Sequence, residues 1–183
     1  MISKAIGLVL FIILSPILLI TALIIFFDSG SPVLFKQERV GLDNNNYFVY
    51  KFRTMEKNTA DIPTHLINND QKLFIYCGRF LRKFSIDELP QLINIMRGEM
   101  KFIGPRPALF NQDDLIALRT KSGIHKLYPG ITGWAQVNGR DNLTIEEKVK
   151  FESFYLNNQS LILDIKILFM TAFQIIFPKG VSN

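Results

Sequence analysis

The most restrictive feature of the sequence is an uncharged, apolar stretch that covers residues 5–27. As an α-helix it would be roughly 35 Å long, while the hydrocarbon core of a bilayer is about 30 Å thick. A secretory signal peptide has a shorter apolar region, and Phe26-Phe27-Asp28 is a poor context for its cleavage. The stretch therefore predicts a helix embedded in a membrane.

The dipeptide Ser15-Pro16 lies near the middle of this stretch. Proline removes one backbone hydrogen bond and clashes with the carbonyl of Ile12, so we expect a kink, where the Ser15 hydroxyl can bond a freed carbonyl. A bent full span and a re-entrant helix both fit, and the spacing alone favours the span. Positive residues flank the stretch on both sides, namely Lys4 before it and Lys36 and Arg39 after it. Such flanks draw both ends to the cytoplasmic face, which favours a re-entrant helix.

Charge and composition narrow the class of partner. The net charge of +5 and the sequence pI near 9.4 suit an anionic partner such as a membrane surface or a phosphorylated substrate. No arginine-rich run with interleaved aromatic residues is present, so we expect no nucleic acid partner. Cys77 is the only cysteine, which excludes an internal disulfide and a cysteine metal cluster.

The remainder of the chain predicts an α+β fold that is mostly helical. Strand-forming residues at 33–35 and 47–50 flank an Asx-rich segment at 41–46, which indicates a β-hairpin. Helical patterns follow at residues 73–84, 89–96, 113–121 and 146–156. A last apolar stretch at 161–177 contains Asp164 and Lys166, so we expect a helix that lies in the membrane interface or packs on the domain.

Two adjacent carboxylates, Asp87 and Glu88, form the candidate catalytic centre. Either a capping box from Ser85 to Glu88 or a cap by Asp87, which suits Pro90 better, would place them at a helix N-terminus and keep them ionised. Such acids are common at helix starts without any function. The functional alternative is an Asp that attacks phosphorus beside a Glu that helps to hold Mg²⁺, with Arg82 neutralising a diphosphate.

A second candidate is Arg106, which stands between Pro105 and Pro107 after Gly104. Two prolines fix the backbone and a glycine permits close approach, so a rigid arginine suited to phosphate is one reading. A surface turn with a solvated arginine is the other.

The glycine-rich segment 129–140 matches no phosphate-binding fingerprint. Within it, Trp134 suits a core or membrane-anchoring position better than a stacking platform. His65 and His125 lack the spacing of metal ligands, and we interpret both as incidental.

The chain resembles the monotopic phosphoglycosyl transferases, the bacterial sugar transferase family, in their minimal small form. Beside Ser15-Pro16, four motifs carry the resemblance: Lys51-Phe52-Arg53-Thr54-Met55, Asp87-Glu88-Leu89-Pro90-Gln91, Gly104-Pro105-Arg106-Pro107 and Pro129-Gly130-Ile131-Thr132-Gly133. Their order and spacing agree over nearly the whole chain. The resemblance implies transfer of a sugar 1-phosphate from a UDP-sugar to polyprenyl (undecaprenyl) phosphate, with release of UMP, as the first membrane step of glycoconjugate assembly.

The resemblance also assigns roles. Asp87 would form a covalent aspartyl-phosphosugar, assisted by Glu88, and both would hold Mg²⁺. The substrate-binding residues would be Lys51, Arg82, Pro105 and Arg106 at the phosphates, and Gln136, Asn138 and Arg140 in the loop that shapes the nucleotide-sugar site. Trp134 receives no sugar role.

The resemblance favours the re-entrant topology as well. Residues 1–28 would form a re-entrant membrane helix, and residues 29–183 a catalytic domain with an interfacial C-terminal helix, on the cytoplasmic face of the bacterial inner membrane among its lipids. A homodimer is an open alternative.

Two rival functions remain. A soluble or peripheral phosphatase would also use Asp and Mg²⁺, but it would need neither Ser15-Pro16 nor the apolar C-terminal stretch. A non-enzymatic membrane-surface adaptor would explain the apolar helix and the basic charge, but not Asp87-Glu88 beside Arg82 and Arg106.

Overall fold

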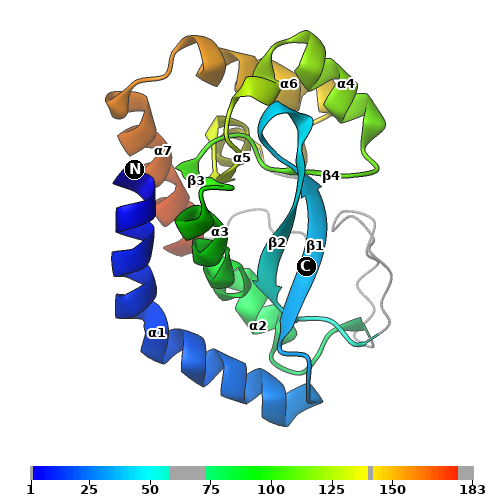
Figure 1. The fold of residues 1–183 in the computed structure, drawn as a ribbon, viewed down its shortest axis with the longest axis vertical. Coiled ribbons are helices and arrows are strands. Elements are labelled where there is room, and N and C mark those ends of the chain that lie inside the picture. Colours follow the sequence, from blue (N-terminus) through cyan, green and yellow to red (C-terminus); the bar gives the residue numbers. More distant parts are fainter. Residues whose placement is uncertain (1, 58–72, 140–141, 177–183) are drawn as a thin grey trace.

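The computed structural model describes residues 2–57, 73–139 and 142–176, which form an α+β fold dominated by helices (Figure 1). The helices are α1 (Ile2–Ser29), α2 (Gly78–Lys83), α3 (Leu92–Arg97), α4 (Asp113–Lys121), α5 (Trp134–Asn138), α6 (Ile145–Asn157) and α7 (Leu161–Ile176). The strands are β1 (Leu34–Val40), β2 (Asn46–Phe52), β3 (Lys101–Ile103), β4 (Ala108–Leu109) and β5 (Gly130–Thr132). Three 3₁₀ helices, η1 (Leu42–Asn44), η4 (Ile86–Gln91) and η5 (Ile124–Lys126), complete the described elements.

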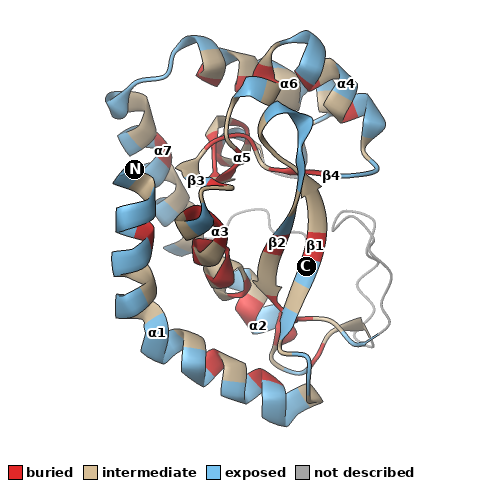
Figure 2. Ribbon diagram, in the orientation of Figure 1, coloured by how far each residue is buried: buried red, intermediate tan, exposed pale blue. Residues whose placement is uncertain are grey.

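Helix α1 is long and apolar enough to cross a membrane, by length and composition alone. Figure 1 shows that it changes direction near its middle, where Pro16 lies inside the helix. The Ser15 hydroxyl donates a 2.7 Å hydrogen bond to the carbonyl of Ile12, as predicted for a proline kink. Only Gly7, Thr21 and Ile25 of α1 are buried, so most of its apolar surface is left outside the protein core (Figure 2).

The C-terminal end of α1 is tied to the rest of the chain by polar contacts. The Nη2 of buried Arg53 donates to the carbonyls of Ser29 at 3.0 Å and of Gly30 at 2.7 Å. A cation at the last carbonyls of a helix satisfies groups that have no partner within the helix and complements its dipole. In addition, the carboxylate of Asp28 accepts the backbone N–H of Cys77. The end of α1 therefore has a fixed place beside β2 and α2.

The predicted β-hairpin is present, with β1 and β2 antiparallel in register from Leu34 opposite Phe52 to Val40 opposite Asn46. Asp43 and Asn44 adopt left-handed backbone conformations in the turn, with φ of 51° and 60°, which Asx residues tolerate better than most others. The strands are longer than predicted, and the two-residue strand β4, which the sequence did not indicate, pairs with β1. A separate pair, β3 and β5, is parallel.

The open edge of β2 is closed by one buried side chain. The sheet order is β2-β1-β4, so one side of β2 has no neighbouring strand. Asn94 of α3 fills this position: its Oδ1 accepts the N–H of Tyr50 at 3.1 Å and its Nδ2 donates to the carbonyl of Phe48 at 2.7 Å. Nδ2 also donates to Glu99 at 2.7 Å, and Asn94 is fully buried. This amide holds the segment 86–97 against the sheet.

Several predicted helices are confirmed and some boundaries are corrected. α4 spans the predicted residues, and α6 is one residue longer than predicted at each end. α7 agrees with its prediction as far as residue 176, and residue 177 lies outside the described residues. The pattern at 73–84 yields only α2, which begins at Gly78. The pattern at 89–96 yields the 3₁₀ helix η4 followed by α3.

Both proposed caps at the candidate catalytic segment are wrong. Ser85 has a left-handed backbone, with φ of 55°, and its side chain makes no capping hydrogen bond. Asp87 lies inside η4, together with Pro90. A capping box does occur elsewhere, between Thr144 and Glu147 at the start of α6.

The polar residues of α7 face the domain. Asp164 accepts a 2.8 Å hydrogen bond from the hydroxyl of Tyr155, and Lys166 lies over the ring of Trp134. Trp134 itself stacks on Phe154 and packs beside a buried cluster, which agrees with a packing role. The apolar residues that α7 leaves exposed are Leu161, Ile162, Ile165, Leu168, Phe169, Phe173 and Ile176 (Figure 2).

We expect Asn94→Ala to lower the free energy of unfolding by about 2–4 kcal/mol, because it removes a fully buried amide and leaves an N–H and a carbonyl of β2 without their partners. Denaturant unfolding in detergent micelles measures this change. The matched control is Asn158→Ala, which removes a single exposed hydrogen bond to Phe154 and should change stability by less than about 1 kcal/mol. Equal losses in both variants would contradict the role of Asn94 at the strand edge.

Candidate active site

The two candidate carboxylates meet three basic residues from separate parts of the chain. Asp87 and Glu88 are carried by η4, which packs against β2 and places Glu88 beside Lys51. The Nζ of Lys51 lies 2.8 Å from Oε1 of Glu88, and the Nη2 of Arg106 lies 3.3 Å from the same oxygen. The structure therefore brings Lys51 and Arg106 together at Glu88.

The two carboxylates have very different surroundings. Asp87 is only 8% exposed, and its carboxylate accepts no hydrogen bond from the residues that the structure describes. Burial, together with the negative charge of Glu88, raises the pKa of Asp87 to about 6, although Lys51, Arg82 and Arg106 oppose the rise. For Glu88, burial acts in the same direction, but the nearby charges of Lys51 and Arg106 outweigh it and hold its pKa well below the usual range.

The pKa values of the two carboxylates follow from burial and neighbouring charges, and not from the helix dipole that the sequence led us to expect. The segment is a 3₁₀ helix preceded by a left-handed Ser85, and burial dominates the pKa of Asp87. Glu88 is held ionised by two cations. Asp87 has a raised pKa, and its carboxylate has no hydrogen-bond partner in the described residues. Such a pair of carboxylates is suited to unequal roles.

Arg82, the third basic residue, is oriented by two contacts outside the carboxylate pair. Its Nε donates a 2.9 Å hydrogen bond to the hydroxyl of Thr54, and its guanidinium stands over the ring of Phe74 at 5.0 Å. Both contacts orient the side chain, and its charge acts on Asp87. The sequence predicted Arg82 here, but gave no sign that Thr54 would orient it.

Arg106 is held in a tight turn and does not merely reach into solvent. A Cβ on Gly104 would lie 2.2 Å from the carbonyl oxygen of Tyr128, so the close approach predicted for this glycine is confirmed. The side chain of Arg106 is 42% exposed, and one end of it pairs with Glu88. The solvated-turn interpretation is therefore wrong, while phosphate binding by Arg106 stays a prediction.

The glycine-rich segment contributes packing around β5 and α5. The Nε2 of Gln136 donates to the carbonyl of Ile131 at 3.1 Å, and the Nδ2 of Asn138 donates to the carbonyl of Trp134 at 2.7 Å. Within the described residues, neither side chain contacts Asp87 or Glu88. Arg140 lies outside the described residues. The proposed roles of these three residues in substrate binding stay predictions.

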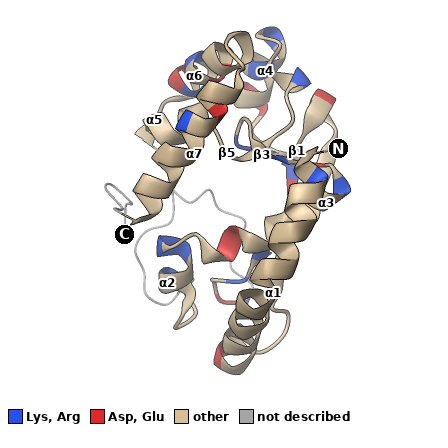
Figure 3. Ribbon diagram, turned by 90° about the vertical axis from the view of Figure 1, so that its left-hand side faces the viewer, with Lys and Arg blue, Asp and Glu red and all other residues tan. Residues whose placement is uncertain are grey.

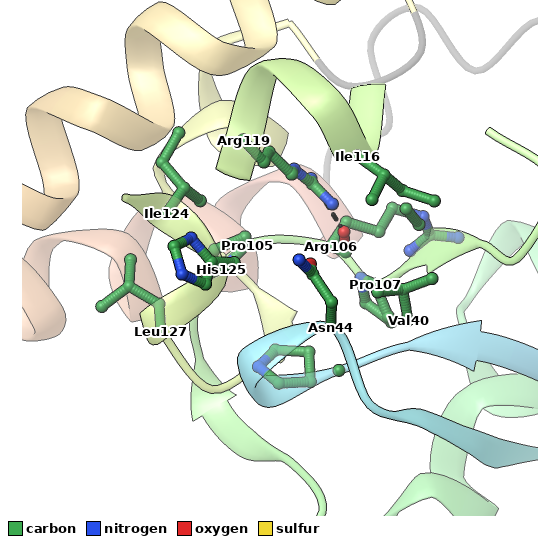
Figure 4. Close-up of a pocket in the computed structure, with 13 residues that line it drawn as sticks. Val40, Asn44, Pro105, Arg106, Pro107, Ile116, Arg119, Ile124, His125 and Leu127 are labelled. Atoms are coloured by element: carbon green, nitrogen blue, oxygen red, sulfur yellow. Dashed lines mark hydrogen bonds between the residues drawn. The ribbon is translucent and has the colours of Figure 1, made fainter. Parts of the chain in front are cut away.

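A pocket lies beside the turn that holds Arg106, and residues of that turn line it (Figure 4). It is lined by residues of the hairpin turn, of α4 and of η5, among them Asn44, Arg119 and His125. Arg119 reaches across it and donates a 2.9 Å hydrogen bond to the carbonyl of Arg106. No local pattern around Arg119 signals its role, because its ionic partner Glu152 lies in a different helix, α6.

The carboxylate pair fits a magnesium ion bound together with a substrate. No group of three or more His, Cys, Asp or Glu side chains that could hold a metal occurs within residues 2–57, 73–139 and 142–176. Mg²⁺ commonly takes one or two carboxylates and completes its shell with water and substrate phosphates. Since Oε1 of Glu88 is engaged by two cations, Asp87 is the better placed of the two ligands.

Charged residues are unevenly distributed over the molecule. Figure 3 shows blue and red segments in the domain that carries the site, whereas the charged residues of α1 are Lys4 and Asp28, near its two ends. The site thus belongs to a polar domain attached to an apolar helix.

A model of the bacterial sugar transferase family matches residues 1–178. An uncharacterized sugar transferase, EpsL of Bacillus subtilis, is 40% identical, over 92% of this chain and 82% of the relative. The UDP-glucose:undecaprenyl-phosphate glucose-1-phosphate transferase of Escherichia coli is 39% identical over 89% of this chain, which spans only 37% of that protein. A UDP-N-acetylgalactosamine-undecaprenyl-phosphate N-acetylgalactosaminephosphotransferase of Aeromonas hydrophila is 36% identical, over 86% of this chain and 38% of the relative. The match over nearly the whole chain and the identities to these enzymes show that this chain belongs to the bacterial sugar transferase family and is a phosphoglycosyl transferase.

Proposed function

We propose that the enzyme transfers a sugar 1-phosphate from a UDP-sugar to polyprenyl phosphate, through a covalent intermediate on Asp87, and releases UMP. The observation that carries this proposal is a buried Asp87, without a partner among the described residues, beside a Glu88 that two cations hold ionised. The names of the relatives support the substrate classes, since they include transferases for UDP-glucose and for UDP-N-acetylgalactosamine that act on undecaprenyl phosphate.

In the first step, a carboxylate oxygen of Asp87 attacks the sugar-linked phosphorus of the UDP-sugar. The bond from this phosphorus to the bridging oxygen breaks, and its electron pair leaves with UMP. Lys51, Arg82 and Arg106 carry positive charge around Asp87 and stabilise the charge that develops on the phosphate oxygens. Glu88 keeps Lys51 and Arg106 in place through its two ion pairs.

In the second step, a phosphate oxygen of polyprenyl phosphate attacks the same phosphorus. The bond between phosphorus and Asp87 breaks, which restores the carboxylate and yields polyprenyl diphosphate-sugar. In the first step, Mg²⁺ held by Asp87 and Glu88 would neutralise charge on the diphosphate of the donor. In both steps Asp87 must form or break a bond to phosphorus, which explains why its carboxylate has no hydrogen-bond partner in the described residues. Glu88 forms no such bond and stays paired with Lys51 and Arg106.

The membrane placement is part of the proposal. Ser15-Pro16 bends α1 near its middle, and positive residues flank the helix on both sides. We place α1 as a re-entrant helix that enters and leaves on the cytoplasmic face of the bacterial inner membrane, and α7 with its exposed apolar residues in the interface. The polyprenyl acceptor, which resides in the membrane, then meets the site at the membrane surface.

An adaptor without enzymatic activity would not account for this centre. Burying two neighbouring carboxylates costs free energy unless both are compensated, and Asp87 is not compensated by a hydrogen bond within the described residues. A panel of UDP-sugars with polyprenyl phosphate separates the candidates, because only the transferase releases UMP in an acceptor-dependent manner. A phosphatase would release inorganic phosphate instead.

We expect Asp87→Asn to abolish formation of the adduct, because the amide lacks the charged attacking oxygen. Intact mass spectrometry after incubation with UDP-sugar and Mg²⁺, without acceptor, measures the adduct. The wild type should gain the mass of one sugar phosphate and lose it when polyprenyl phosphate is added, whereas turnover of Asp87→Asn should fall by roughly three or more orders of magnitude. The companion variant Glu88→Gln should be slow but retain a trace of adduct. An adduct of equal yield in Asp87→Asn would refute the assignment.

The pH dependence of activity should follow the raised pKa of Asp87. Because attack requires the ionised carboxylate, kcat/KM for the UDP-sugar should be level above about pH 7 and fall roughly tenfold per pH unit below about pH 6. Glu88 remains ionised in this range, since its pKa is held low. The fluorescence of Trp134, the only tryptophan, serves as the control for an intact fold at each pH. A level profile down to pH 5 would count against Asp87 as a buried nucleophile.

Replacing Pro16 by Leu should restore the missing hydrogen bond, straighten α1 and move a measurable fraction of molecules to a full span. Labelling of a cysteine introduced at Ser3 with a membrane-impermeant reagent in intact cells measures this fraction, in a Cys77→Ser background. The unaltered helix should give no labelling from outside the cell. Full labelling from outside the cell with Pro16 present would contradict the re-entrant topology.

A further inference from the structure

The turn that presents Arg106 is held through its carbonyl groups. Two of its three residues are prolines, so Arg106 has the one N–H that the turn itself could donate. Each of the three successive carbonyls accepts one hydrogen bond: Pro105 from the N–H of Gly130 at 2.9 Å, Arg106 from Nη2 of Arg119 at 2.9 Å, and Pro107 from Nη1 of Arg39 at 3.0 Å. The middle contact, on Arg106 itself, depends on a side chain of α4.

Arg119 is in turn held by a buried ion pair with Glu152. The two residues are 8% and 3% exposed, and the Nε of Arg119 lies 2.8 Å from Oε2 of Glu152. Its Nη2 bonds both Oε1 of Glu152 and the carbonyl of Arg106. The carboxylate therefore sets the plane of the guanidinium, and that plane aims an N–H at the turn (Figure 4).

A stabilising role alone is a poor explanation for this pair. Desolvating two charges costs about as much as their attraction returns, and apolar residues of similar volume are often at least as stable. What an apolar pair cannot supply is the hydrogen bond to the carbonyl of Arg106. The pair is thus better explained by the orientation that it imposes than by the stability that it provides.

We infer that Arg119, oriented by Glu152, is a positioning residue that fixes the turn of Arg106 so that its guanidinium faces the donor diphosphate beside Glu88. This inference rests on the proposed function for the identity of the ligand. It assigns to α4 and α6 a role in binding the donor, although neither helix carries a residue of the carboxylate centre.

A binding cycle with UDP as the probe tests the inference without turnover. The full chain in micelles is titrated with UDP by calorimetry as wild type, Arg106→Ala, the double variant Arg119→Met with Glu152→Met, and all three changes together. We expect the dissociation constant for UDP to rise roughly tenfold in Arg106→Ala, which loses one charge-assisted contact with the diphosphate. A similar factor is expected in the Met pair, in which Arg106 remains but is no longer oriented. The triple variant should bind no more weakly than Arg106→Ala alone.

Thermal unfolding of the same proteins separates positioning from stability. The Met pair should unfold at the wild-type temperature or above it, although its affinity for UDP is reduced. The matched control is Leu115→Ala, which creates a cavity next to the buried face of α4. This variant should unfold at a lower temperature and bind UDP as the wild type does. Should the Met pair itself fold poorly, Arg119→Lys keeps the charge beside Glu152 and loses the planar fork.

Two results would overturn the inference. One is wild-type affinity for UDP in both the Met pair and Arg119→Lys. The other is a triple variant whose loss equals the product of the separate losses, which would mean that Arg119 acts independently of Arg106. Acceptor-dependent UMP release by the wild type is measured separately, so that a failure of the proposed function is distinguishable from a failure of the positioning role.

Discussion

The arrangement depends on how the open edge of β2 is closed. An unpaired strand edge exposes N–H and carbonyl groups that require partners. The buried amide of Asn94 supplies one acceptor and one donor to this edge, much as a neighbouring strand would. Because Asn94 stands in the helix that continues η4, the same contact fixes Asp87 and Glu88 beside the strand that carries Lys51. A single buried amide therefore joins the sheet to the segment that carries the two carboxylates of the site.

Asp87 and Glu88 are both carboxylates, but their surroundings give them different pKa values. Glu88 faces Lys51 and the end of Arg106, whose charges outweigh the cost of its burial. Asp87 is buried next to that fixed negative charge, so its own ionised form is less favoured and more reactive toward an electrophile. The different roles proposed for Asp87 and Glu88 follow from which carboxylate the fold places beside the cations. They do not follow from the order of the two residues in the chain.

Local patterns in the sequence predicted most of the elements, and long-range contacts explain most of the errors. The kink at Pro16 and the helix α4 follow from the local chemistry of proline and from helical periodicity, and both are present. The capping box at Ser85 was wrong because Ser85 is left-handed and makes no capping hydrogen bond, and the segment after it is a 3₁₀ helix that packs against β2. The buried pair of Arg119 and Glu152 joins residues 33 positions apart, and neither residue has a local pattern that would reveal its partner.

The packing of α1 on α3 has a consequence for the way this protein meets a lipid. A Cβ on Gly7 would lie 3.0 Å from the side chain of Ile95, and Leu10, Phe11 and Leu14 pack on the same cluster. Since the far end of α1 is bound by Arg53, the apolar helix is tied at both ends to the domain that carries the carboxylates. With α1 in the membrane as proposed, a helix tied in this way would adjust to a bilayer of different thickness by tilting. That tilt would set the depth at which the carboxylates meet a lipid phosphate, so turnover would depend on bilayer thickness.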